Sequence, residues 1–100
     1  MIYLEKESDF DSITSKGVVL VDFFATWCGP CQLINTELEK LEKEVSNLTI
    51  LKVDVDKFGL LAIKFNVNSI PDIKVIKDGK IIKSAIGYKT SEELKQLLEK

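Results

Sequence analysis

The segment that most restricts the possible folds is Val18–Ala25, which is apolar at every position except Asp22. Hydrophobic side chains on both faces of a strand are typical of a central strand in a sheet that helices cover on both sides. The 100 residues suffice for one domain, in which roughly two-thirds of the unfolded surface becomes buried. We therefore expect a single α/β domain over residues 1–100.

Strand-like and helix-like patterns alternate along the rest of the chain. Ser8 predicts the N-cap of a first helix that ends at Gly17, and a continuous apolar face predicts a long helix from about residue 29 to 45. The other predicted elements are strands at 2–4, 48–55, 72–77 and 80–86, a helix around 58–65, and a last helix after the capping-box sequence 90–93.

The order of these elements is β-α-β-α-β-α-β-β-α. Strands joined through helices are expected to be parallel, with right-handed crossovers. Asp78-Gly79 suits a two-residue hairpin turn, so the last two strands add an antiparallel pair at one side. The sequence thus predicts a central mixed β-sheet of about five strands, flanked on both faces by about four α-helices.

The residues Trp27-Cys28-Gly29-Pro30-Cys31 lie where the apolar strand ends and the long helix begins. Two cysteines three positions apart can lie side by side on a first helical turn. The first thiol then faces the free N–H groups and the positive end of the helix dipole, which favours a thiolate and lowers its pKa. Proline is tolerated in a first turn, and glycine leaves the backbone open to a substrate chain.

A metal site or a purely structural disulfide accounts for the cysteine pair less well. A zinc site needs about four ligands, and this chain has two Cys and no His. A structural disulfide that closes so small a ring constrains the unfolded chain very little. We therefore expect a redox-active pair, with no metal and no cofactor.

Charge and composition exclude other classes of function. All 14 basic residues are Lys, none is Arg, and the net charge is -2, which does not favour nucleic-acid binding. The sequence shows neither a signal peptide nor an apolar segment of bilayer length, so we expect a cytoplasmic protein with no membrane association.

Asp22 is the best candidate for a general base, because the chain has no His. It precedes Cys28 by six residues and can therefore lie beneath the cysteine pair. Burial would raise the pKa of this carboxyl. The alternative is an acid that reaches the surface or pairs with a Lys.

The segment VDFFATWCGPC resembles the active-site segment of the thioredoxin family, and the similarity extends over essentially the whole chain. Further matches are Asp22, Ile70-Pro71, the KDGK hairpin and Gly87. The resemblance implies the thioredoxin fold and a thiol–disulfide oxidoreductase that reduces protein disulfides as an electron donor in cell redox homeostasis. It also implies a monomer, disulfide-containing protein substrates and a thioredoxin reductase that returns the electrons.

The resemblance also implies a role for each site residue. Cys28 is the nucleophile, Cys31 is the resolving thiol, and Asp22 accepts a proton from Cys31 through water. Lys52 is the matching basic position in the next central strand, where it either moderates the desolvation of Asp22 or reaches the solvent. The remaining residues would form a shallow substrate groove beside a cis-proline: Trp27, Gly29, Pro30, Ile70, Pro71 and Gly87.

Two other functions stay open at this point. An oxidase or isomerase is disfavoured because no His separates the cysteines and no export signal is present. A binding module, in which the groove and not the cysteines does the work, would keep its activity in a double Cys-to-Ser variant.

Five positions depart from the family pattern: Phe24, Gln32, Thr36, Ser69 and Asp72. Thr36 stands where proline often kinks the helix, so we expect a straighter helix. Asp72 either raises the pKa of Cys28 electrostatically or points away, into the solvent or toward a neighbouring Lys such as Lys74 or Lys83.

Overall fold

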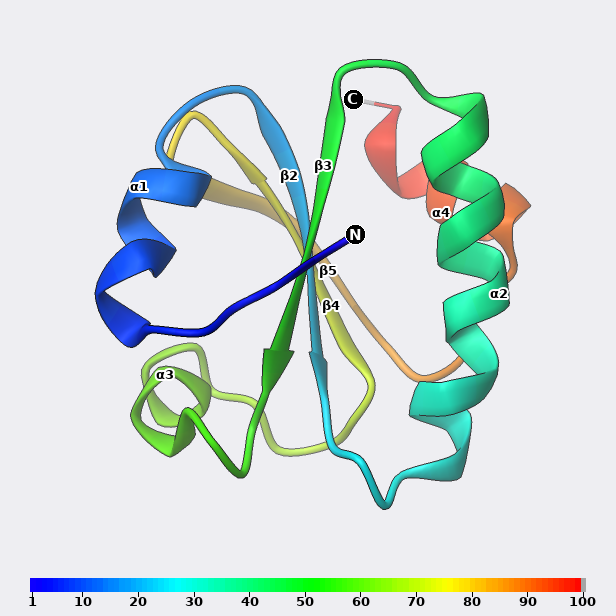
Figure 1. The fold of residues 1–100 in the computed structure, drawn as a ribbon. Coiled ribbons are helices and arrows are strands. Elements are labelled where there is room, and N and C mark those ends of the chain that lie inside the picture. Colours follow the sequence, from blue (N-terminus) through cyan, green and yellow to red (C-terminus); the bar gives the residue numbers. More distant parts are fainter. Residues whose placement is uncertain (100) are drawn as a thin grey trace.

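The computed structural model describes residues 1–99, in which five strands form one mixed sheet of order β1-β3-β2-β4-β5. The strands are β1 (Ile2–Tyr3), β2 (Val18–Phe24), β3 (Leu48–Asp54), β4 (Asp72–Lys77) and β5 (Lys80–Ile86). The helices are the 3-10 turn η1 (Glu7–Asp9), α1 (Phe10–Thr14), α2 (Gly29–Glu44), α3 (Gly59–Lys64) and α4 (Ser91–Leu98). Figure 1 shows the sheet edge-on, with α1 and α3 on one face and α2 and α4 on the other. The predicted mixed sheet is confirmed.

One expectation about strand direction is wrong. β1, β3 and β2 are parallel, but β4 is antiparallel to β2 although α3 connects it to β3. With six residues, α3 is about 9 Å long, whereas β3 with seven residues extends about 23 Å. α3 thus spans little of the sheet, and the chain enters β4 at the end where β2 and β3 finish (Figure 1).

The start of the first helix also differs from its prediction. Ser8 lies inside η1, and α1 begins at Phe10 without a side-chain cap from Asp9. The capping box of α4 is confirmed: the Glu93 N–H donates to Thr90 Oγ1 at 3.2 Å, and the Thr90 N–H donates to Glu93 Oε1 at 2.9 Å.

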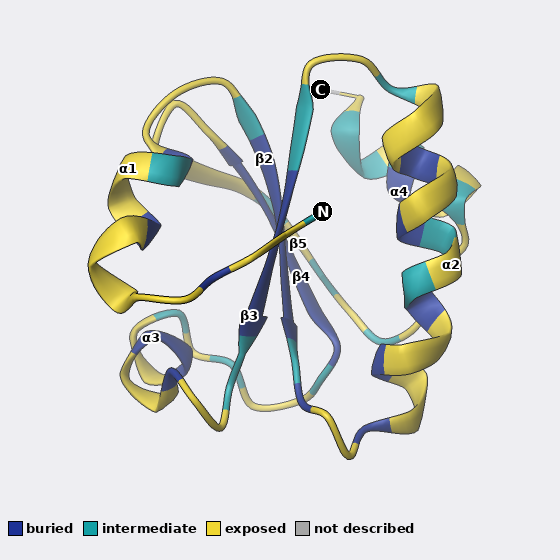
Figure 2. Ribbon diagram, viewed as in Figure 1, coloured by how far each residue is buried: buried dark blue, intermediate teal, exposed yellow. Residues whose placement is uncertain are grey.

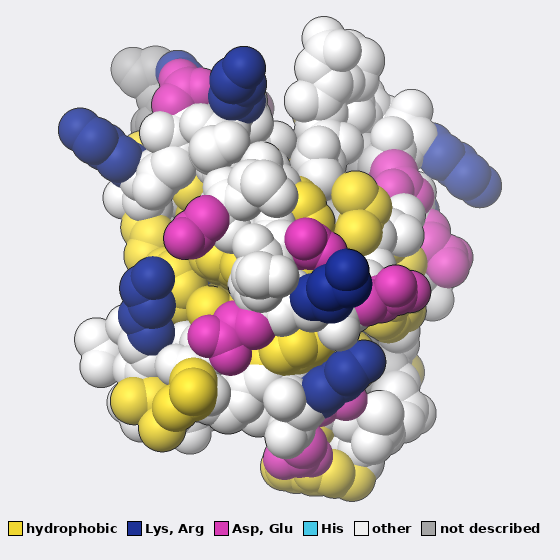
Figure 3. Space-filling model, turned by 60° about the vertical axis from the view of Figure 1, so that its left-hand side comes forward, with side chains coloured by type: hydrophobic (Ala, Val, Ile, Leu, Met, Phe, Trp, Pro, Cys, Tyr) yellow, Lys and Arg dark blue, Asp and Glu magenta, His cyan; other side chains and the backbone are white. Residues whose placement is uncertain are grey.

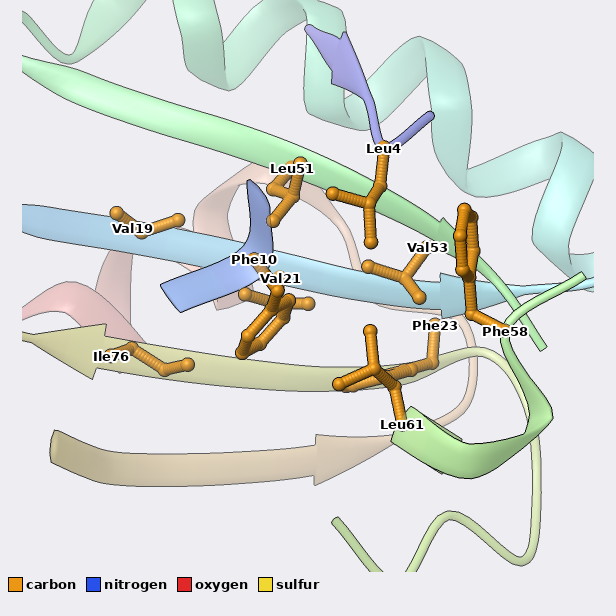
Figure 4. Close-up of a cluster of buried hydrophobic side chains, with 10 residues drawn as sticks. All are labelled: Leu4, Phe10, Val19, Val21, Phe23, Leu51, Val53, Phe58, Leu61 and Ile76. Atoms are coloured by element: carbon orange, nitrogen blue, oxygen red, sulfur yellow. The ribbon is translucent and has the colours of Figure 1, made fainter. Parts of the chain in front are cut away.

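Two hydrophobic clusters join the helices to the sheet, and Figure 2 shows that the strands and the inward faces of the helices carry most of the buried residues. Figure 4 shows the cluster under α1 and α3, which includes Phe10, Phe23 and Leu61. The cluster under α2 and α4 consists of Leu20, Ile34, Leu38, Leu41, Ile50, Ile73 and Leu94. Among residues 1–99, no helix is long and apolar enough to cross a membrane.

Candidate active site

The cysteine pair lies at the N-terminus of α2, shortly after the end of β2. Cys28 is the N-cap residue, and Cys31 lies in the first turn with Pro30 before it. The two cysteines form a disulfide with their Cα atoms 5.3 Å apart. The Cys31 N–H donates to Cys28 Sγ at 3.3 Å, so the sulfur takes the place of a capping oxygen at the positive end of the helix dipole.

The residue before a cis-proline lies against Cys28. The Ile70–Pro71 peptide bond is cis, as the family resemblance implied. The Ile70 carbonyl oxygen is 3.9 Å from Cys28 Sγ, and the Gly87 N–H donates to the Pro71 carbonyl at 2.8 Å. The reversed direction of β4 causes this contact, because the strand starts beside the end of β2.

Three other predicted groove residues are close neighbours of Cys28 in the sequence. Trp27 is 71% exposed, and Gly29 and Pro30 are also exposed. The Trp27 indole N–H donates to Asp56 Oδ2 at 2.8 Å, which holds the ring over the loop after β3. Sequence reasoning missed Asp56, since no local pattern links these two positions.

Asp22 and Lys52 form an ion pair inside the molecule. They are direct partners in the β2–β3 register, and Lys52 Nζ donates to Asp22 Oδ2 at 2.6 Å. Their side chains are 0% and 1% exposed, so Lys52 does not reach the solvent. Asp22 Oδ1 is buried and has no hydrogen-bond partner among residues 1–99.

Burial raises the pKa of Asp22 above its ordinary value, as the sequence predicted. The charge of Lys52 and its hydrogen bond lower this pKa without cancelling the effect of burial, and the charge of Asp72 raises it further. The chain therefore holds a carboxyl group with a raised pKa on the side of the sheet that α2 covers.

The surroundings of Lys52 include two residues that sequence reasoning did not assign to the site. Lys52 Nζ also donates to Asn35 Oδ1 and lies 4.7 Å from the centre of the Phe24 ring. A signal for Asn35 existed: it follows Cys31 by four residues, about one helical turn, and so lies above the same edge of the sheet.

Asp72 points into the molecule and not into the solvent. Its side chain is 1% exposed, and Lys74 Nζ lies 3.1 Å from Oδ1 and donates to Oδ2 at 3.3 Å. This is the expected alternative in which a neighbouring Lys pairs with Asp72. Its register partner is Phe23, so it lies on the opposite face of the sheet from Asp22.

An N–H group directed at the Cys28 sulfur stabilises negative charge there, and negative charge is what a thiol needs to attack another disulfide. A dithiol of this kind can open a disulfide and close its own without a metal, and residues 1–99 contain no cluster of His, Cys, Asp or Glu that would hold one. The fold and the site together define a thiol–disulfide oxidoreductase.

Comparisons with known proteins identify the family. A sequence model of the thioredoxin family matches residues 1–100. Thioredoxin from Bacillus subtilis (strain 168) is 44% identical over 95 residues, which cover 94% of this chain and 91% of that protein. Thioredoxin from Chlamydia trachomatis serovar D is 39% identical over 100 residues, which cover 100% of this chain and 98% of that protein.

The solved structure of Plasmodium falciparum thioredoxin superposes with a TM-score of 0.91 at 38% identity, covering 99% of this chain and 97% of that one. The chain belongs to the thioredoxin family. It reduces protein disulfides as an electron donor in cell redox homeostasis, through a Cys28–Cys31 pair that alternates between dithiol and disulfide.

Proposed function

We propose that Cys28 is the attacking thiol. The observation that carries this assignment is the Cys31 N–H directed at Cys28 Sγ, which would stabilise a thiolate in the reduced protein. The Cys28 thiolate attacks one sulfur of a substrate disulfide, forms a mixed disulfide and releases the other sulfur as a thiolate. Cys31 then attacks Cys28 Sγ and releases the second substrate thiolate, so two electrons pass from the protein to the substrate.

In the second step, Asp22 accepts the proton of the Cys31 thiol, through water. The buried Oδ1 atom has no hydrogen-bond partner among the described residues, so it can take a proton without breaking an existing bond. A raised pKa makes this carboxylate a better proton acceptor near neutral pH. Lys52 modulates Asp22 through the ion pair.

The substrate would bind beside the cis-proline as an extended segment. The Ile70 backbone, with its carbonyl 3.9 Å from Cys28 Sγ, offers a hydrogen-bonding edge to such a segment. The exposed apolar ring of Trp27, together with Gly29, Pro30, Pro71 and Gly87, would complete the groove.

The remaining parts of the proposal concern the cellular setting. A thioredoxin reductase would return two electrons and two protons to the Cys28–Cys31 disulfide. Residues 1–100 would act as one thioredoxin domain, as a monomer and in the cytoplasm.

Two single variants test the assignment of the cysteines. Cys28→Ser should abolish insulin reduction with dithiothreitol as the electron source, because no nucleophile remains. Cys31→Ser should accumulate mixed disulfides that non-reducing electrophoresis detects, because the resolving thiol is lost. Equal trapping by both variants would contradict the assignment.

A double Cys28→Ser, Cys31→Ser variant separates exchange chemistry from simple binding. We expect it to be inactive in every assay of disulfide reduction. Retention of the cellular activity by this variant would indicate a binding module in place of a reductase.

A further inference from the structure

Four groups from three elements surround the ammonium of Lys52. Asp22 Oδ2 of β2 lies 2.6 Å away, and Asn35 Oδ1 of α2 accepts a second hydrogen bond. The rings of Phe24 and Tyr3 have their centres 4.7 Å and 6.0 Å from Nζ. A buried ammonium needs acceptors for its protons, and Asn35 supplies the only neutral oxygen acceptor that the structure gives this group among residues 1–99.

The position of Asn35 follows from the geometry of α2. Cys31, Ile34 and Leu38 face the sheet at helical spacing, and Asn35 lies at the margin of this face, partly exposed. Lys52 therefore donates one hydrogen bond to Asn35 of the covering helix α2 and one to Asp22 of the neighbouring strand β2.

We propose that Asn35 is a positioning residue that holds the Lys52 ammonium against the Asp22 carboxylate. This rests on the proposed role of Asp22 in resolving the mixed disulfide. In this role Asn35 acts through Lys52, to which its side chain is hydrogen-bonded.

The space beside Lys52 explains why positioning is needed. A pocket of about 240 Å³ is lined by Cys31, Asn35, Lys52 and Phe24, among others. It has room for several water molecules at about 30 Å³ each. Without the Asn35 oxygen, the flexible lysine chain can turn its ammonium into this pocket, where water replaces both acceptors. Asp22 would then lose its opposite charge, and its proton would be harder to remove.

The direct test is a titration of the Asp22 carboxyl carbon by NMR in the oxidised protein. The disulfide does not titrate there. The charged groups that act on Asp22 are Lys52, its partner on the same face of the sheet, and Asp72, which lies on the opposite face. Asn35→Ala should raise the pH midpoint of the Asp22 titration by about one unit. This is the lower end of the shift that an opposite charge within a few ångströms produces in a carboxyl group.

Thr36→Ala is the matched control, since Thr36 is the next residue of α2 and is exposed. It should leave the Asp22 midpoint unchanged. An unchanged midpoint in Asn35→Ala, or an equal shift in both variants, would overturn the proposal.

A double-mutant cycle shows whether the effect passes through Lys52. In a Lys52→Met background, Asn35→Ala should no longer move the Asp22 midpoint, because there is no ammonium to position. A shift of full size in that background would overturn the proposal, since Asn35 would then act on Asp22 by another route.

A kinetic readout links the position of Lys52 to the reaction. In single-turnover mixing of the reduced protein with a disulfide substrate, Asn35→Ala should move the pH midpoint of mixed-disulfide resolution upward, in step with the NMR shift. An NMR shift without a kinetic shift would leave Asn35 as the positioning residue and remove Asp22 from the resolving step. The two outcomes therefore separate this inference from the proposed function.

Discussion

Asp22 and Lys52 are two charged side chains on a face of the sheet whose other buried side chains in β2 and β3 are hydrophobic. A buried ion pair contributes little net stability, because the cost of removing both charges from water is close to their attraction. The neighbouring pair on the same face, Leu20 and Ile50, is hydrophobic, as expected where a pair serves only to pack the core. The small net stability of such a pair supports the proposed role of Asp22 as a proton acceptor near Cys31.

The raised pKa of Asp22 predicts how stability depends on pH. Between the ordinary Asp pKa of 3.8 and the raised pKa of the folded state, the folded protein binds more protons than the unfolded chain. The free energy of unfolding therefore falls as the pH rises through this window. Each unit of difference between the two pKa values is worth about 1.4 kcal/mol.

Asp22→Asn removes this titration and keeps the shape of the side chain. We expect oxidised Asp22→Asn to have a larger free energy of unfolding than the parent protein at neutral pH, and the gain to disappear below about pH 4, near the ordinary Asp value. Urea unfolding at a series of pH values measures it. Asp11→Asn, an exposed position, serves as the control. A gain that is constant across the pH range would show that Asp22 is not the titrating group.

At the scale of elements, α2 connects the disulfide to the hydrophobic core. Its 16 residues run without interruption from Gly29 to Glu44, and Thr36 lies in the middle. Threonine keeps an N–H that can bond to the carbonyl of Gln32 and has no ring to clash there. The helix α4 packs beside α2, and the Ser91 N–H donates to Glu37 Oε1 at 2.9 Å, so a bend in α2 would disturb both helices.

Thr36→Pro should therefore destabilise the protein by up to about 3 kcal/mol, the cost of a proline inside a helix. Thr36→Ala should change stability little, since Ala is a better helix former. Urea unfolding of the oxidised forms compares the two variants. A loss below about 0.5 kcal/mol for Thr36→Pro, within the range of neutral surface substitutions, would mean that α2 accommodates a kink at this position.

At the scale of the whole molecule, the surface mixes charges of both signs with scattered apolar side chains, as Figure 3 shows for the face turned toward the reader. The strand β5 forms one edge of the sheet and exposes Ile81, Ile82 and Ile86. An exposed apolar edge strand invites pairing with another chain, and lysines on the strand oppose it. Lys80 and Lys83 occupy such positions in β5.

We expect a monomer whose edge is protected by these lysines. Sedimentation over a range of concentrations should give one species with the mass of a single chain. Replacing Lys80 and Lys83 together with Val should produce association that increases with concentration. Association of the unaltered protein at low concentration would contradict this expectation.

Local patterns in the sequence determined much of this protein. The apolar stretch around Asp22 predicted a buried central strand, and the Asp78-Gly79 pair predicted a hairpin turn, in which both residues have positive φ. The cysteine pair at a strand–helix boundary predicted a thiolate at a helix N-terminus, where Cys31 N–H meets Cys28 Sγ. These features depend on neighbours in the chain, so a local pattern is sufficient.

Only the tertiary structure decided how distant segments meet. The chain enters β4 from the end where β2 finishes, which brought Ile70 to Cys28, although strands joined through a helix are expected to be parallel. Packing of α2 on the sheet brought Asn35 to Lys52, and the β2–β3 register placed Lys52 beside Asp22. Such contacts depend on strand register, on how a helix packs against the sheet and on how far the side chains are buried. A local sequence pattern specifies none of these directly.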